Sequence, residues 1–168
     1  MNIDIKYSKH IDLVFHVLAY MRVNNASDCF EQSYIDIMKK EKTNFDFDLL
    51  AEIKALEKYY NDNFERVILI NFLPFYSNSF DELKKTFLSC TYFTDADKNI
   101  FIKPFISLLE KESIFYFEYW QNKYDSMLYQ RQLIESNLKK ELNKYSCMFD
   151  YYNKSALAYL SISITKKW

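Results

Sequence analysis

The sequence predicts a mainly α-helical single domain, and three observations support that prediction. Glycine is absent from the 168 residues, and Pro74 and Pro104 are the only prolines, so little interrupts a helix. Apolar residues recur at spacings of three and four over most of the chain. Residues 2–7 and 156–168 instead alternate apolar and polar residues, which is typical of strands. We expect a helical bundle of roughly six to seven helices, with a small two-stranded sheet formed by the N- and C-terminal strands.

The first half of the chain predicts helices that begin after polar residues. Ser8 can cap a helix over residues 9–22, and a weaker helix follows over about 31–42. The next helix begins at Asp46 or Asp48 and has an apolar stripe that continues as far as Val67.

The polar triplet 61–63 crosses that stripe and favours a break in the helix. Asp62 would cap the second piece, with Glu65 three residues later. The run Val67–Tyr76 that follows is apolar on all sides, so we expect it to be covered on every side.

Two further caps and a proline organise the second half. Ser79 with Glu82 forms a capping-box pattern, and Thr94 is a second capping candidate. Pro104 suits the first turn of a long helix, since its missing N–H needs no partner there. About fifty uninterrupted helical residues would span about 75 Å, so we expect a bend in residues 122–126.

The end of this long helix has a coiled-coil-like seam, spaced 4, 3, 4 and 3, formed by Leu138, Leu142, Tyr145, Phe149 and Tyr152. If the helix does not bend, it must protrude and pair with another chain. The seam is therefore one candidate surface for a partner protein.

The segment Glu112–Tyr124 contains six aromatic residues, namely Phe115, Tyr116, Phe117, Tyr119, Trp120 and Tyr124. On a helix they cover an arc of about 200°, against about 100° for one packing stripe, with a polar face opposite. The segment is either a central helix packed from two sides, or it leaves Tyr116, Tyr119, Trp120 and Tyr124 facing a ligand or a partner.

His10 and His16 are the only histidines, and they lie about 120° apart on the first helix, so they cannot share a metal there. Asp12 and His16 are four residues apart and share a face. They could form a surface ion pair, act as weak candidates for two metal ligands, or act as a carboxylate-oriented general base. We expect the ion pair.

Two carboxylate pairs, Glu110 with Glu112 and Asp95 with Asp97, are expected to be solvated. Neither pair has the spacing that places two ligands on one helical face. The sequence therefore predicts no metal centre from them.

Composition discounts several classes of protein. Without glycine, a P-loop, a dinucleotide fingerprint or an EF-hand loop is not expected. A net charge of −1 favours neither nucleic acid nor an anionic membrane. Cys29, Cys90 and Cys147 form no metal-binding or paired pattern and predict reduced thiols. The longest apolar run is about half a membrane span, the N-terminus resembles no signal peptide, and the composition suggests an AT-rich bacterial genome, so we expect a cytoplasmic protein.

The expected function is a non-enzymatic protein-interaction or small apolar ligand-binding module, as a homodimer or with a protein partner, and without a cofactor. The alternative is a metal-dependent hydrolase, or a fragment of one, with Asp12 and His16 near the site. In either case the 168 residues could be one part of a longer protein.

Overall fold

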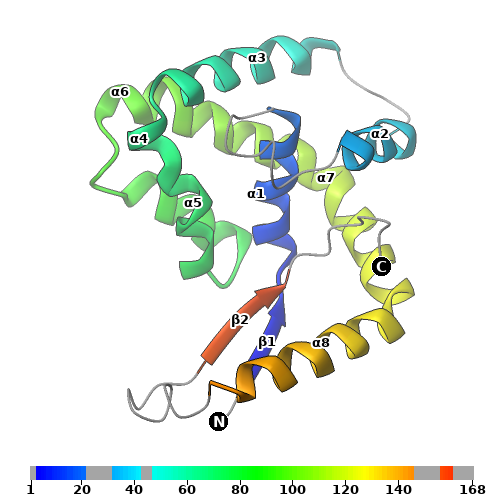
Figure 1. Cartoon of the computed structure of the whole chain (residues 1–168). Coiled ribbons are helices and arrows are strands. Elements are labelled where there is room, and N and C mark those ends of the chain that lie inside the picture. The colour runs from blue at the N-terminus through cyan, green and yellow to red at the C-terminus, as the bar shows by residue number, and fades with distance from the viewer. Residues whose placement is uncertain (1–2, 22–31, 43–46, 146–155, 161–168) are drawn as a thin grey trace.

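The computed structural model describes residues 3–21, 32–42, 47–145 and 156–160. The chain is mainly helical, which confirms the predicted class (Figure 1). The longer helices are α1 (Lys9–Tyr20), α2 (Gln32–Glu41), α3 (Phe47–Asp62), α5 (Phe80–Ser89), α7 (Lys103–Ser126) and α8 (Leu128–Asn143).

The centre of the structure is α1, which lies along α7 and is buried over most of its length (Figure 1). Its most buried apolar residues are Leu13, Val14, Val17 and Leu18. Helices α3 and α5 lie near the first half of α7, and α2 lies near the middle of α7 (Figure 1). Because α1 is surrounded, even its polar residues are drawn into the core.

The predicted break at residues 61–63 is confirmed, because α3 ends at Asp62 and the short helix α4 spans Phe64–Val67. The predicted cap is wrong. Asn63 occupies the capping position, while the Asp62 carboxylate pairs with Lys58 one turn earlier in α3. The Asp62 side chain therefore forms an ion pair within α3 and does not cap α4.

Val67–Tyr76 forms two 3₁₀ turns, Ile68–Asn71 and Leu73–Tyr76, and is not covered on every side as predicted. Val67, Ile70 and Pro74 are buried, but Phe72 is 55% and Tyr76 is 77% exposed. Residues three and four apart share one side of such turns, so the inner side alone reaches the core.

The two predicted caps are confirmed. The Ser79 hydroxyl accepts a hydrogen bond of 3.2 Å from the Glu82 backbone N–H at the start of α5, although the Glu82 carboxylate returns to the Asn78 N–H. Thr94 and Asp97 form a complete capping box around the short helix α6 (Asp95–Asp97).

Asp97 is fully buried, which corrects the prediction that it is solvated. Besides the Thr94 hydroxyl and N–H, the Tyr59 hydroxyl and the Arg66 guanidinium donate to its carboxylate. Asp97 therefore joins the end of α3 and helix α4 to the start of the long helical segment.

Pro104 lies in the first turn of α7, as predicted, but helical structure begins before it. A π-helical turn, Lys98–Ile102, joins α6 to α7. A proline ring collides with the carbonyl four residues earlier in a regular helix, and a wider turn is one way to relieve that collision.

The predicted bend is confirmed at the end of α7. Met127 has φ −102° and ψ 23°, outside helical values, and α8 starts at the next residue. Helix α8 then runs back toward β1 (Figure 1). Its direction places the residues after Met127 beside the N-terminal strand.

Strand β1 (Ile3–Tyr7) pairs with β2 (Ala156–Leu160) in parallel, from Ile3 opposite Ala156 to Tyr7 opposite Leu160. This single two-stranded ladder lies beside α8 in an otherwise helical structure (Figure 1). The rest of the alternating C-terminal stretch, and Phe149 and Tyr152 of the seam, lie outside the described residues.

Candidate functional site

A cluster of buried polar side chains lies where α1, α2 and α7 meet. It consists of His16 from α1, Tyr34 from α2, Lys42 just after α2, and Glu112 and Tyr116 from α7; we call it the His16–Glu112 cluster. His16 is 1% and Glu112 is 3% exposed. Buried groups of this kind persist only where they are hydrogen-bonded or paired.

The cluster forms one chain of hydrogen bonds. The Tyr34 hydroxyl lies 2.8 Å from His16 Nδ1, and His16 Nε2 lies 3.4 Å from Glu112 Oε2. Lys42 Nζ donates to the other oxygen of the same carboxylate. The arrangement fits a neutral imidazole that accepts from Tyr34 at Nδ1 and donates from Nε2 to an ionised Glu112.

The pKa values of the cluster agree with this assignment. Burial lowers the pKa of His16 below its ordinary 6.5, and the nearby Glu112 carboxylate only partly opposes this effect. Burial opposes ionisation of Glu112 most strongly, but hydrogen bonds from His16 and Lys42 outweigh it, so the Glu112 pKa lies below its ordinary 4.5. The cluster therefore holds a neutral histidine and a carboxylate–lysine pair at neutral pH.

Three aromatic rings enclose the imidazole. Tyr116 stacks on His16 with ring centroids 4.3 Å apart, and Tyr20 and Tyr34 meet it edge-on at 4.9 and 6.1 Å. Because the His16 side chain has 0% exposure, it can exchange a proton only with neighbouring side chains in this conformation. A general base must reach its substrate directly or through one water, and in this conformation the imidazole is enclosed by neighbouring side chains.

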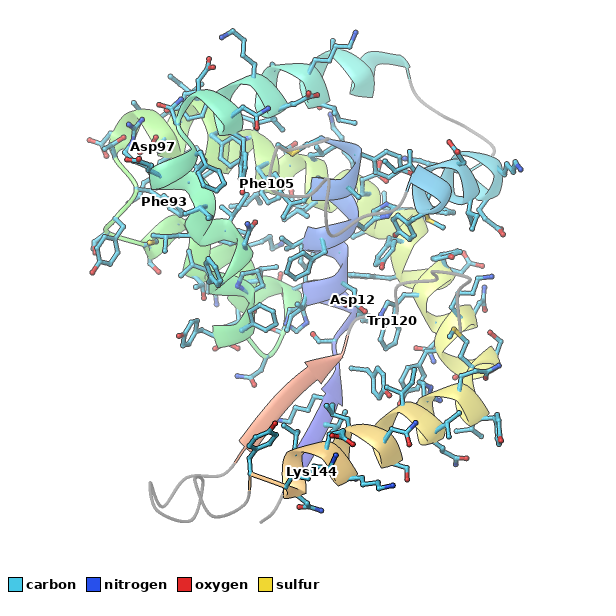
Figure 2. All side chains as sticks on the ribbon, viewed as in Figure 1. Asp12, Phe93, Asp97, Phe105, Trp120 and Lys144 are labelled. Atoms are coloured by element: carbon cyan, nitrogen blue, oxygen red, sulfur yellow. The ribbon has the colours of Figure 1, made fainter. Side chains whose placement is uncertain are left out.

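Asp12 and His16 do not form the predicted surface ion pair. Asp12 is 3% exposed and accepts a hydrogen bond of 2.7 Å from the Trp120 indole N–H. Figure 2 shows the two residues beside each other. His16 finds its carboxylate in Glu112, 96 residues further along the chain. Because α1 is covered on several sides, two residues on one of its faces have separate partners on α7.

Glu112 is buried, against the prediction that it is solvated, and the helical projection contained the signal for it. Measured from Phe115, Glu112 falls at about 60° on the helix, inside the aromatic arc between Tyr119 and Tyr116. A carboxylate on an apolar face predicts a buried partner of opposite charge. Its partner Lys42 lies 70 residues away, and no sequence pattern around Lys42 indicated this pairing.

The four predicted binding residues lie mostly inside the structure. Tyr116, Tyr119 and Trp120 are buried, while Tyr124 is partly buried. Phe115 and Phe117 also pack against the core from the edges of the arc. The Tyr119 hydroxyl is buried and has no hydrogen-bond partner among the described residues.

Tyr124 belongs to a joint between β1, α7 and α8. The Arg131 guanidinium of α8 lies 3.5 Å from the centre of the Tyr124 ring and 5.5 Å from that of Tyr7. Trp120 stacks on the Tyr124 ring, with the ring centroids 4.9 Å apart. Burial, followed by the Glu135 carboxylate, raises the pKa of Tyr7 to about 12. Cation–π contacts therefore hold the start of α8 in place.

The described residues contain no group of three or more His, Cys, Asp or Glu side chains placed to hold a metal ion. Asp12 and His16, the weak metal candidates, are engaged with Trp120, Tyr34 and Glu112. Cys90 has a free thiol, and Cys29 and Cys147 lie outside the described residues.

No helix in the described ranges is long and apolar enough to cross a bilayer.

Comparisons of the chain with protein-family models, with curated proteins and with solved structures find no match.

Proposed function

We propose that this protein is a non-enzymatic interaction module that binds another protein chain through the exposed side of α8. The α8 surface comprises Leu128, Tyr129, Leu133 and Ile134 of the helix, with Tyr145 just beyond its end. The proposed partner is a second copy of the same chain. The same proposal includes a cytoplasmic location and no nucleic acid or cofactor.

The observation that supports the proposal is where large apolar side chains are exposed. Of the eleven exposed large apolar residues in the described ranges, five lie between Leu128 and Tyr145. Scattered exposed apolar residues are normal, but their concentration on one element is typical of an interaction surface.

Helix α8 is also not needed to complete the core. The apolar core of the described residues includes no side chain of α8, and the helix is attached through Arg131 beside Tyr7 and Tyr124. A helix that contributes little to its own core is available to a partner. Its free face carries charges of both signs, including Lys140 and Glu141, so two antiparallel copies could set unlike charges opposite each other.

A small apolar ligand held against Tyr116, Tyr119, Trp120 and Tyr124 stays a prediction, as does the hydrolase alternative with Asp12 and His16. All of these side chains except the partly buried Tyr124 are buried, so neither role has a large accessible surface in the described conformation. The α8 surface is favoured because it is already exposed.

The test compares Ile134→Lys with Ile114→Lys. Ile134 is 40% exposed on α8, and Ile114 is 82% exposed on α7, outside the proposed surface. Sedimentation equilibrium over a range of concentrations measures self-association of the wild type and both variants. We expect Ile134→Lys to weaken dimerisation at least tenfold, and Ile114→Lys to leave it unchanged.

A monomeric wild type at high concentration would contradict self-association. Equal weakening by both lysine substitutions would also contradict the proposal, because it would place the interface elsewhere or reflect net charge alone.

A further inference from the structure

Two polar side chains, Tyr34 of α2 and Lys42 just after it, join the His16–Glu112 cluster. Tyr34 contacts both His16 and Tyr116, and Lys42 pairs with Glu112. The apolar contribution of α2 comes from Ile35 and Met38, which are buried with Tyr34. Helix α2 therefore combines a short apolar face with a concentrated set of polar bonds to two other helices.

Beneath α2 lies a face rich in tyrosine. Tyr20 of α1 and Tyr116 and Tyr119 of α7 are placed around His16 and Glu112. The Tyr119 hydroxyl, close enough to Glu41 to respond to its charge, is buried with no hydrogen-bond partner among the described residues. Such a group costs free energy while α2 is in place and can be hydrated when α2 moves away.

We propose that α2 is an acid-released cover: protonation of His16 and then of Glu112 frees α2 from α1 and α7 while the rest of the fold stays intact. Release exposes the tyrosine-rich face of Tyr20, Tyr116 and Tyr119. The inference does not depend on the α8 surface.

The charges around the cluster set the direction of the effect. The titratable side chains near the cluster come from three helices. Tyr20 and Asp12 lie on α1, Tyr34 and Glu41 lie on α2, and Lys42 follows α2. Tyr116 and Tyr119 contribute from α7. Protonation of His16 turns Nδ1 into a donor, so the Tyr34 hydroxyl can no longer donate to it and must turn its own proton elsewhere in the buried cluster. A protonated Glu112 would lose its attraction to Lys42.

Proton linkage gives the direction in which pH changes the release of α2. Burial holds the pKa of His16 below 6.5, so the released state, in which the imidazole reaches water, binds more protons on acidification. If released His16 titrates at an ordinary pKa, lowering the pH from 7 to 5 favours release by up to about 25-fold. Glu112, whose pKa is also held low, adds to the effect only below its ordinary 4.5.

Hydrogen exchange of the full chain, followed by mass spectrometry between pH 7 and pH 5, tests the proposal. Rates are corrected for the intrinsic pH dependence of amide exchange, and α5 serves as the internal reference. We expect α2 to open more readily than α5 at both pH values, and its opening equilibrium to rise by about 10- to 25-fold between pH 7 and pH 5. A corrected α2 equilibrium that does not change, or equal loss of protection in α2 and α5, would overturn the proposal.

Two matched pairs of variants locate the effect. His16→Gln should abolish the pH-dependent opening of α2, whereas His10→Gln, on the same helix but bonded to the Ser77 carbonyl, should retain it. Glu112→Gln should open α2 at least tenfold already at pH 7. Glu110→Gln, which alters an exposed carboxylate near Lys84, should not.

The wild-type pH series remains decisive if His16→Gln or Glu112→Gln fails to fold. If His10→Gln abolishes the pH dependence as completely as His16→Gln, the proposed origin of the effect is wrong.

Discussion

The Trp120 indole donates a hydrogen bond of 2.7 Å to the Asp12 carboxylate, joining two buried side chains that are 108 residues apart. This bond fixes α1 against the middle of α7. Both residues belong to sequence patterns that are also compatible with binding or metal ligation. Their mutual contact instead gives them a direct role in stability.

Trp120→Phe should lower the free energy of unfolding by about 2 to 4 kcal/mol, because it removes a charge-assisted hydrogen bond and leaves a small cavity. Urea unfolding measures the change. Gln121→Ala, which removes an exposed contact to Asp125 on the same helix, serves as the control and should cost no more than about 0.5 kcal/mol. Equal costs would show that the Asp12 bond contributes nothing beyond the surface contact.

Asp97→Ala should destabilise the protein by about 3 kcal/mol or more. It removes the carboxylate that accepts hydrogen bonds from Thr94, Tyr59 and Arg66. These donors then lose that acceptor in a buried environment. Asp95→Ala, two residues away and exposed, should change stability by less than about 0.5 kcal/mol. Thermal and urea unfolding of the two variants decide between a specific bonding role and a general effect of negative charge near the helix start.

Asp97 also predicts a loss of stability in acid. Burial opposes its ionisation most strongly, but hydrogen bonds from Arg66, Thr94 and Tyr59 outweigh it and hold its pKa well below the ordinary 3.8. A carboxyl group with a lowered pKa stabilises the folded state above its unfolded pKa, and this contribution is lost as the pH falls toward the folded value. Unfolding free energies of Asp97→Asn should therefore depend less on pH below about 4 than those of the wild type.

His10 predicts a separate dependence at milder pH. Burial lowers its pKa below 6.5, with the bond to the Ser77 carbonyl opposing part of the shift. The unfolded chain then binds more protons at this site, so the free energy of unfolding falls as the pH decreases through about 6.5. His10→Gln should flatten the global unfolding profile between pH 7 and pH 5. A slope equal to that of the wild type would contradict this assignment.

Arg131→Lys should loosen α8 although it keeps the positive charge. A planar guanidinium can lie over Tyr124 and Tyr7, whereas a lysine ammonium makes this stacked contact poorly. The expected cost is about 1 kcal/mol, seen as about fivefold faster hydrogen exchange in α8 with α5 unchanged. Gln132→Lys, which places a lysine at the exposed neighbouring position, is the control and should leave hydrogen exchange in α8 unchanged.

Local features of the fold could be predicted because their partners are close in the sequence. The Ser79 and Thr94 caps, the break after Asp62 and the bend after Ser126 each depend on residues within about one helical turn. Asp62 failed as a cap because Lys58, equally close, competed for it. Local patterns predict which side chains can bond, and they do not rank several bonds within reach.

The candidate site could be predicted only in part. The wide aromatic arc correctly indicated a helix packed from more than one side, since Tyr116, Tyr119 and Trp120 are buried. The partners of Asp12 and His16 could not be predicted, because they depend on how α1 meets α7 about a hundred residues later. Glu112 was the exception, since its position within the aromatic arc was visible in the helical projection.

The ladder between β1 and β2 has a consequence for synthesis. Ile3 pairs with Ala156, so the first strand is made 153 residues before its partner. At about 5 to 20 residues per second, β1 waits about 8 to 30 s for β2. During that interval its backbone donors and acceptors must be satisfied by water, a chaperone or another strand. The closing ladder therefore makes translation, as well as stability, a stage at which this chain is open to mispairing.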